Sequence, residues 1–167
     1  MISLTVEYAL RAIVTLAQHD GCPCTARKLA QITHVPLPYL SKLMQGLVRG
    51  GLVNSQRGLH GGFVLTKAPA DLSILDVVNV VEPFRRIAHC PLGIQSHGAS
   101  LCPLHLRLDN AMAAIEELFR ETTVAEMMAQ PGSSTPLCEE ERLISLGIGS
   151  GVATKSKPVA RKSKRSR

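Results

Sequence analysis

The strongest constraint on the fold is a change of hydrophobic period near residue 50. Before it, apolar residues recur at the three- and four-residue spacing of amphipathic helices over residues 4–17, 26–32 and 38–49. After it, two short strand-like runs, 52–57 and 63–67, flank a glycine-rich turn. This order of helices, tight turn and hairpin predicts a winged helix-turn-helix, so the expected fold class is mainly α with a small β-hairpin wing.

The rest of the chain divides into three further segments. A fourth helix is expected from the Ser73 cap to Val81, which closes a DNA-binding domain over residues 1–83. Residues 84–103 have no periodicity and contain two cysteines, so they are expected to form a long functional loop, which is the candidate sensor loop of the chain. A long amphipathic helix is predicted within residues 104–130, followed by a disordered basic tail over residues 131–167.

The composition limits which residues can form the core, and the hydropathy pattern indicates where in the cell the protein is expected. Aromatic residues make up only 3% of the 167 residues and tryptophan is absent, so aliphatic side chains must form the core. No apolar run approaches the roughly 20 residues of a membrane span, and the N-terminus lacks the pattern of a signal peptide. We therefore expect a cytoplasmic protein with no membrane partner.

The formal net charge of +6 is divided unevenly along the chain. Residues 1–67 hold seven basic and two acidic side chains, residues 68–154 hold five and eleven, and residues 155–167 hold seven basic ones alone. A basic winged module suits a polyanion such as DNA. The basic tail predicts salt-sensitive affinity for DNA that does not depend on base sequence.

Residues 38–49 are the candidate for the helix that enters the major groove. Ser41, Lys42 and Gln45 carry groups that can donate to or accept from base edges. Tyr39 and Arg49 can hold phosphates. The side chains expected to face the core are Leu40, Leu43, Leu47 and Val48.

The flanking elements add expected backbone contacts. Arg27 and Lys28 begin the preceding helix, where phosphate contacts are expected, and Arg57 and His60 in the wing can reach a minor groove. The candidate DNA-binding set is therefore Arg27, Lys28, Pro38, Tyr39, Ser41, Lys42, Gln45, Arg49, Arg57 and His60. The alternative is that these side chains form the solvated face of an ordinary helical domain.

The predicted loop repeats a short pattern, Cys90-Pro91-Leu92 and Cys102-Pro103-Leu104. His105 follows Cys102 by three residues, which places both on one face of the first turn of the next helix. Stable disulfides are rare in a reducing compartment, so thiols, redox sensors or metal ligands are expected. Thiolates beside imidazole suit an iron–sulfur cluster or zinc, and the spacing alone leaves iron–sulfur, zinc and no metal open.

Three stretches then point to a family. They are Val6-Glu7-Tyr8-Ala9-Leu10-Arg11-Ala12, Pro38-Tyr39-Leu40-Ser41-Lys42-Leu43 and Gly51-Leu52-Val53-x-Ser55-x-Arg57-Gly58-x-x-Gly61-Gly62-Phe63-x-Leu65. Up to about residue 129, the sequence resembles the IscR and NsrR-type (Rrf-two) family of bacterial transcription regulators. The resemblance implies a homodimer whose long helices, residues 104–130 here, pair. It also implies a palindromic double-stranded DNA operator and an iron–sulfur cluster in the loop.

The same resemblance implies a ligand set, with one departure. Cluster-containing members have three cysteines in this loop; Cys90 and Cys102 match the outer two, but Ser96 stands at the middle position. His105 matches a ligand of one branch, and Glu7 matches an acidic ligand that the partner subunit supplies in others. Because a site with few thiolates is less negative, we expect a 2Fe-2S cluster first and a 4Fe-4S cluster second.

The function expected is a dimeric DNA-binding transcriptional regulator whose operator affinity an iron–sulfur cluster controls. One alternative is a cluster-free or zinc-binding repressor of the same fold that senses a metabolite or a partner protein. Another is a winged-helix module for protein assembly or RNA binding. No nucleophile–base arrangement predicts catalysis, so an enzyme is not expected. Glu7 also has a simpler interpretation, an ion pair with Arg11 on the next helical turn.

Overall fold

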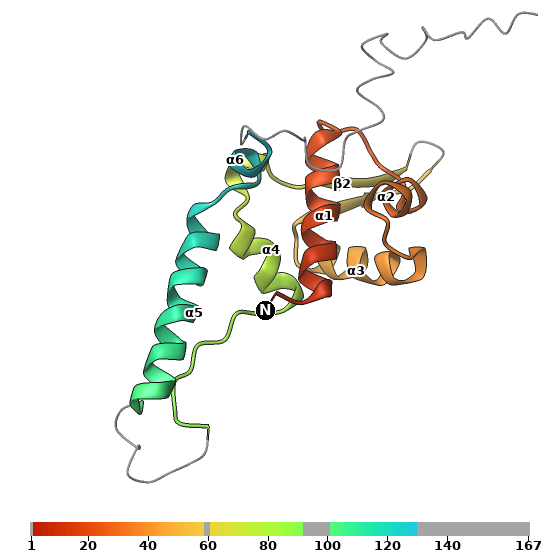
Figure 1. Cartoon of the computed structure of the whole chain (residues 1–167). Helices are drawn as coiled ribbons and strands as arrows, with labels where there is room; N and C mark the ends of the chain where they lie inside the picture. Colours follow the sequence, from red (N-terminus) through yellow and green to blue (C-terminus); the bar gives the residue numbers. More distant parts are fainter. Residues whose placement is uncertain (1, 59–60, 92–100, 130–167) are drawn as a thin grey trace, which may run out of the picture. The chain divides into compact units, whose positions relative to one another are not determined.

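A computed structural model describes residues 2–58, 61–91 and 101–129 (Figure 1). Its elements are α1 (Leu4–Gln18), α2 (Ala26–Thr33), α3 (Leu37–Arg49), β1 (Val53–Gln56), β2 (Gly62–Leu65), the 3-10 turn η1 (Pro69–Asp71), α4 (Ile74–Val81), α5 (Pro103–Glu121) and α6 (Val124–Ala129). The two strands are antiparallel, with Val53 opposite Leu65 and Gln56 opposite Gly62. The expected winged helix-turn-helix architecture is confirmed. The predicted tail lies outside the described residues.

Local signals fix the helix ends. The Thr25 hydroxyl accepts a hydrogen bond of 3.2 Å from the backbone amide of Lys28 in the first turn of α2. Ser73 and Asp76 form a reciprocal capping box at the start of α4, with N–O distances of 3.0 and 3.1 Å. At the end of α3, Gly51 takes a φ of 75°, which a side chain would resist.

The core lies where α1 packs against α2, α3 and α4 (Figure 1). Ile13 of α1, Leu29 of α2 and Met44 of α3 are completely buried there, and Val77 of α4 joins them. The fully buried side chains are aliphatic or small, as the low aromatic content predicts.

The hairpin is attached to the loop ahead of α2. The backbone amide of Cys24 donates to the carbonyl of Phe63 at 3.0 Å, and the Phe63 amide donates back to the Cys24 carbonyl at 2.8 Å. A Cβ atom at Gly62 would lie 2.7 Å from the Cys24 carbonyl, so this approach requires glycine. The wing is therefore held at its base by backbone hydrogen bonds to a second segment.

After α5 the chain returns to the winged module. The Ile74 amide donates to the carbonyl of Thr122 at 3.0 Å, and the Val124 amide donates to that of Leu72 at 2.8 Å. Val124 is fully buried in the module's core. Thus α6 belongs to the core of the module, and only α5 extends beyond it. Within the described ranges, no helix has the length and apolar character to cross a membrane.

Candidate nucleic-acid interface and sensor site

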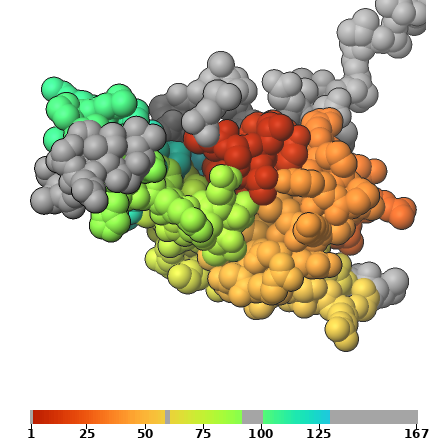
Figure 2. Space-filling model, turned by 90° about the horizontal axis from the view of Figure 1, so that it is seen from below, coloured from red at the N-terminus to blue at the C-terminus, as the bar shows by residue number. Residues whose placement is uncertain are grey.

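The α3 helix lies at the surface beside β1, in the orange and yellow region of Figure 2, and its exposed side chains include polar ones. Lys42 and Gln45 are exposed on it and Ser41 is half-buried. Leu40 and Met44, both completely buried, anchor the opposite face. Of the side chains predicted to face inward, Leu43 and Leu47 are buried and Val48 is half-buried. The buried side chains thus hold α3 against the core and leave its polar side chains at the surface.

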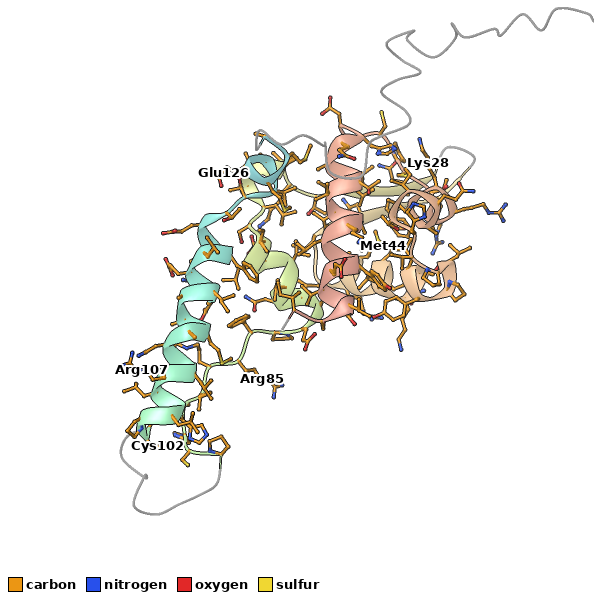
Figure 3. The ribbon with its side chains drawn as sticks, in the orientation of Figure 1. Lys28, Met44, Arg85, Cys102, Arg107 and Glu126 are labelled. Atoms are coloured by element: carbon orange, nitrogen blue, oxygen red, sulfur yellow. The ribbon has the colours of Figure 1, made fainter. Side chains whose placement is uncertain are left out.

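The other predicted DNA contacts lie around this face. Arg27 and Lys28 are exposed in the first turn of α2, and Figure 3 shows Lys28 on the outer side of the helix. Arg49 in the last turn of α3 and Arg57 directly after β1 are also exposed. Pro38 is exposed at the start of α3, and His60 lies outside the described residues.

Tyr39 has contacts that the sequence did not predict. Its hydroxyl lies 2.6 Å from the Thr5 hydroxyl of α1. Its ring meets that of Tyr8 edge to face, with the centroids 5.7 Å apart and the planes at 81°. Tyr39 is 40% exposed. It therefore holds the first turn of α3 against α1.

Arg11 on the same face of α1 contacts the other side of the tight turn. Its guanidinium donates to the carbonyl of Thr33, the last residue of α2, at 3.1 Å, and its Cζ lies 5.5 Å from the Tyr8 ring centroid. It also pairs with Glu7, as the simpler interpretation of that residue predicted. Only this i, i+4 pair was visible in the sequence, because nothing local indicates the approach of the Thr33 carbonyl.

The predicted ligands of the loop come together at the start of α5. The Nδ1 atom of His105 lies 3.2 Å from the Sγ of Cys102 and 3.9 Å from the Sγ of Cys90. Cys102 occupies the N-cap position of α5, at the end of the helix distant from α6 (Figure 3). All three side chains are partly buried. The expected proximity of Cys102 and His105 on one turn is confirmed, and Cys90 joins them from twelve residues earlier.

These donors suit a soft metal centre without completing one. Among the described residues, no group of three or more His, Cys, Asp or Glu is arranged to hold a metal ion. Sulfur and nitrogen ligands of one tetrahedral metal lie about 3.5 Å apart, and the two S–N distances, 3.2 and 3.9 Å, bracket that value. Thiolate and imidazole are ligands of iron–sulfur clusters and zinc alike. The donor types therefore suit such a group, although the described residues are not arranged as a complete site.

The remaining candidate ligand stands elsewhere in the chain. Glu7 lies in the first turn of α1, where its carboxylate pairs with Arg11. The middle loop position, Ser96, lies outside the described residues. The contacts of His105 with Cys90 and with Cys102 therefore define the candidate site.

A carboxylate of α5 holds the segment that carries Cys90. Asp109 accepts hydrogen bonds from Arg86 Nε at 2.7 Å, from Arg86 Nη2 at 2.5 Å and from the Ile87 amide at 2.9 Å. The Arg86 hydrogen bond is the main cause of a lowered pKa at Asp109. The same hydrogen bond is the main reason that the pKa of Arg86 is raised. No local pattern indicates this bidentate pair, because its members are 23 residues apart.

Comparison with known proteins identifies the family of the chain. A model of the Rrf2 family, described as an iron-dependent transcriptional regulator, matches residues 2–130. The HTH-type transcriptional regulator NsrR of Geobacillus kaustophilus is 29% identical over 142 residues, which cover 81% of this chain and 95% of the relative.

Two solved structures are similar over most of the chain. CymR, the global cysteine regulator of B. subtilis, superimposes with a TM-score of 0.64 and 26% identity, covering 76% of this chain and 95% of that one. IscR of T. potens gives a TM-score of 0.64 and 27% identity, covering 80% and 93%. The family match extends from α1 through α6. The chain therefore belongs to the Rrf2 family of helix-turn-helix transcriptional regulators, whose members bind DNA and usually act as dimers.

Proposed function

We propose that this protein is a homodimeric transcriptional regulator that binds a palindromic operator and whose operator affinity is controlled by an iron–sulfur cluster. The observation that carries the proposal is the convergence of Cys90, Cys102 and His105 at the start of α5, with S–N distances of 3.2 and 3.9 Å. Two soft thiols and an imidazole, brought together from positions within fifteen residues of one another, are the donor types that such clusters use.

The DNA-binding half of the proposal is supported by exposure and charge. Lys42 and Gln45 lie on the open face of α3, and Arg27, Arg49 and Arg57 surround it with exposed guanidinium groups. Side chains of this kind suit base edges in the centre and phosphates at the periphery. The remaining candidates, Lys28, Pro38, Tyr39, Ser41 and His60, are proposed to contribute at the same interface.

Dimerisation is supported by the apolar side chains that α5 leaves uncovered. The exposed fractions are 64% for Leu104, 48% for Leu108, 43% for Ile115 and 60% for Leu118. These positions follow one another at spacings of four, seven and three residues, so they form one stripe along the helix. A stripe of this length is an exposed hydrophobic patch of the kind that marks an interface, and a second α5 is the proposed partner.

Cys90, Cys102 and His105 are the residues proposed to hold the cluster, with Glu7 of the partner protomer as the remaining ligand. When bound, a 2Fe-2S or 4Fe-4S cluster would supply a redox-active centre that reacts with oxidants or nitric oxide. Ligation would exchange part or all of the Glu7 ion pair with Arg11 for a bond to the cluster. Because Arg11 also holds the Thr33 carbonyl beside the helix-turn-helix, this exchange connects the sensor ligands to the DNA-binding face.

The deciding experiment is an anaerobic absorbance spectrum of the purified protein with iron and sulfide counts. We expect visible absorbance, with iron and sulfide present in the wild type and lost in Cys102→Ala. Cys22→Ala is the matched control, because Cys22 is an exposed cysteine in the loop after α1 and is not part of the ligand set. A colourless wild type without iron, whose Cys102→Ala variant still regulates normally, contradicts the cluster proposal.

A second candidate is a cluster-free or zinc-binding regulator that uses the same pair of cysteines. The similarity to CymR, the global cysteine regulator of B. subtilis, favours it, as does the serine at the middle cysteine position. Zinc without sulfide, or neither metal nor sulfide, would decide for this candidate in the same analysis.

A further inference from the structure

The segment that leads to Cys90 is attached to α5 before it reaches the sulfur site. It leaves α4 and runs beside the first half of α5 (Figure 1). Near its start the Phe84 amide donates to the Asn79 side chain at 3.1 Å. Arg85 then points away from α5 (Figure 3), whereas Arg86 and the Ile87 amide bind Asp109.

We propose that Asp109 is a positioning residue for the sensor site, because its hold on Arg86 and Ile87 sets Cys90 beside Cys102 and His105. The proposal rests on the proposed function for its biological meaning, but the geometry it describes can be measured without any cofactor.

The lengths along the two chains agree with this role. From Asp109 back to Cys102, seven residues of helix rise by about 10.5 Å. From Ile87 to Cys90, three residues reach at most about 10 Å, and the chain bends at His89 on the way. Fixing Ile87 at the level of Asp109 therefore allows Cys90 to reach the level of Cys102, in the direction antiparallel to the helix. Without the contacts of Asp109, Cys90 would be held only by a longer segment that begins near the end of α4.

The contact itself is stronger than an ordinary surface ion pair. The Arg86 side chain is 42% exposed and the Asp109 side chain 13%. Isolated pairs of this exposure contribute little, but here the carboxylate accepts a bidentate guanidinium and a backbone amide together. Glu116 adds a second carboxylate 3.8 Å from Arg86. The lowered pKa of Asp109 agrees with a carboxylate held in its charged form.

Disulfide trapping measures the position of Cys90 directly. Both sulfurs contact the same nitrogen of His105, at 3.2 and 3.9 Å, so they lie at most about 7 Å apart. Diamide would take two electrons and two protons from the two thiols, forming the Cys90–Cys102 disulfide and the reduced hydrazine. Arg86 and Arg107 are successive tryptic sites, so both cysteines fall in one peptide, residues 87–107. The extent of disulfide formation is measured as the loss of alkylated cysteine in that peptide.

The variants are made in the full-length, metal-free protein. Asp109→Asn keeps the shape of the side chain but removes its charge, and we expect the rate of disulfide trapping to fall about threefold. Asp109→Ala removes both side-chain acceptors, and we expect that rate to fall about tenfold. Glu121→Gln is the matched control on the same helix, since Glu121 is exposed at the far end of α5 from the segment, and it should trap at the wild-type rate. Both tryptic sites remain in all three variants.

The outcomes separate this inference from the proposed function. Equal trapping rates in wild type, Asp109→Asn and Asp109→Ala, with helicity by circular dichroism unchanged, would overturn the positioning role, as would a wild type that never forms the disulfide. Anaerobic reconstitution with ferrous iron and sulfide is measured in parallel. A wild type that takes up neither ends the cluster proposal, while the trapping rates still decide the role of Asp109.

Discussion

The contact between Thr5 and Tyr39 is expected to position α3, the helix that is proposed to enter the major groove. The two hydroxyls lie 2.6 Å apart, and the Tyr39 ring also meets Tyr8. If the hydroxyl of Tyr39 acts by fixing α3 against α1, then Thr5→Val and Tyr39→Phe remove the same interaction from opposite sides. If it acts by contacting a DNA phosphate alone, only Tyr39→Phe has an effect.

The magnitude follows from the chemistry of the contact. A neutral hydrogen bond contributes about 0.5–1.5 kcal/mol, which corresponds to about a twofold to tenfold loss of operator affinity in each single variant. The ring contact with Tyr8 survives in Tyr39→Phe, so its contribution is not lost. The double variant should bind about as well as either single one, because each has already removed the shared interaction.

Fluorescence anisotropy can measure these affinities on a duplex selected from a random library by the wild-type protein, with an unrelated duplex for non-specific binding. We expect the selected duplex to lose affinity while the unrelated duplex does not. Tyr8→Phe is the control, since it keeps the ring contact and the Thr5–Tyr39 hydrogen bond. Wild-type affinity in Thr5→Val, beside a clear loss in Tyr39→Phe, would refute the positioning argument.

Three further predictions concern the core, the Asp109 contact and the tail. Leu40→Ala should lower the free energy of unfolding by about 2–5 kcal/mol, because Leu40 is completely buried; a denaturant midpoint equal to the wild type's would contradict this. The pKa of Asp109 lies below its ordinary value of 3.8. The Asp109 contact should therefore stabilise the fold fully above pH 3.8, and this stabilisation should be lost as the pH falls through the folded-state pKa. A titration of the Ile87 amide resonance measures that pKa, and a midpoint at 3.8 or above would show the contact to be absent. Deletion of residues 155–167, which carry seven basic side chains, should weaken binding to all DNA similarly and reduce its salt dependence; a change in operator preference would show that the tail reads sequence.

The parts of the fold that the sequence predicted are those specified by local signals. The Ser73 cap acts over a few residues and appears where the pattern places it. The Thr25 cap and the glycine after α3 are equally local devices. The approach of His105 to Cys102 is equally local, because three residues make almost one helical turn.

The contacts that build the site from distant segments were not predictable in this way. Asp109 and Arg86 are single charges in a segment with many charges, and neither hydropathy nor spacing pairs them. Arg11 looked like half of a local ion pair, yet it also caps the end of α2 through Thr33. Such contacts depend on how separate segments of the chain pack together, and no periodicity in a single sequence encodes that packing.

The first turn of α1 joins the two halves of the proposed mechanism. Ser3 caps this turn and donates to Glu82 at 2.5 Å, at the point where the chain leaves α4 toward Cys90. Thr5, two residues later, contacts Tyr39 at the start of the reading helix. A displacement of the segment after α4 therefore acts on the same helical turn that holds α3. We expect coupling between sensor and DNA to require only a small rigid shift of α1, because packed helices transmit strain instead of absorbing it. Glu82→Gln weakens the contact with Ser3. It should then reduce the difference in operator affinity between the protein with its cluster and the protein without it, measured by the same fluorescence anisotropy. It should leave binding of the unrelated duplex unchanged.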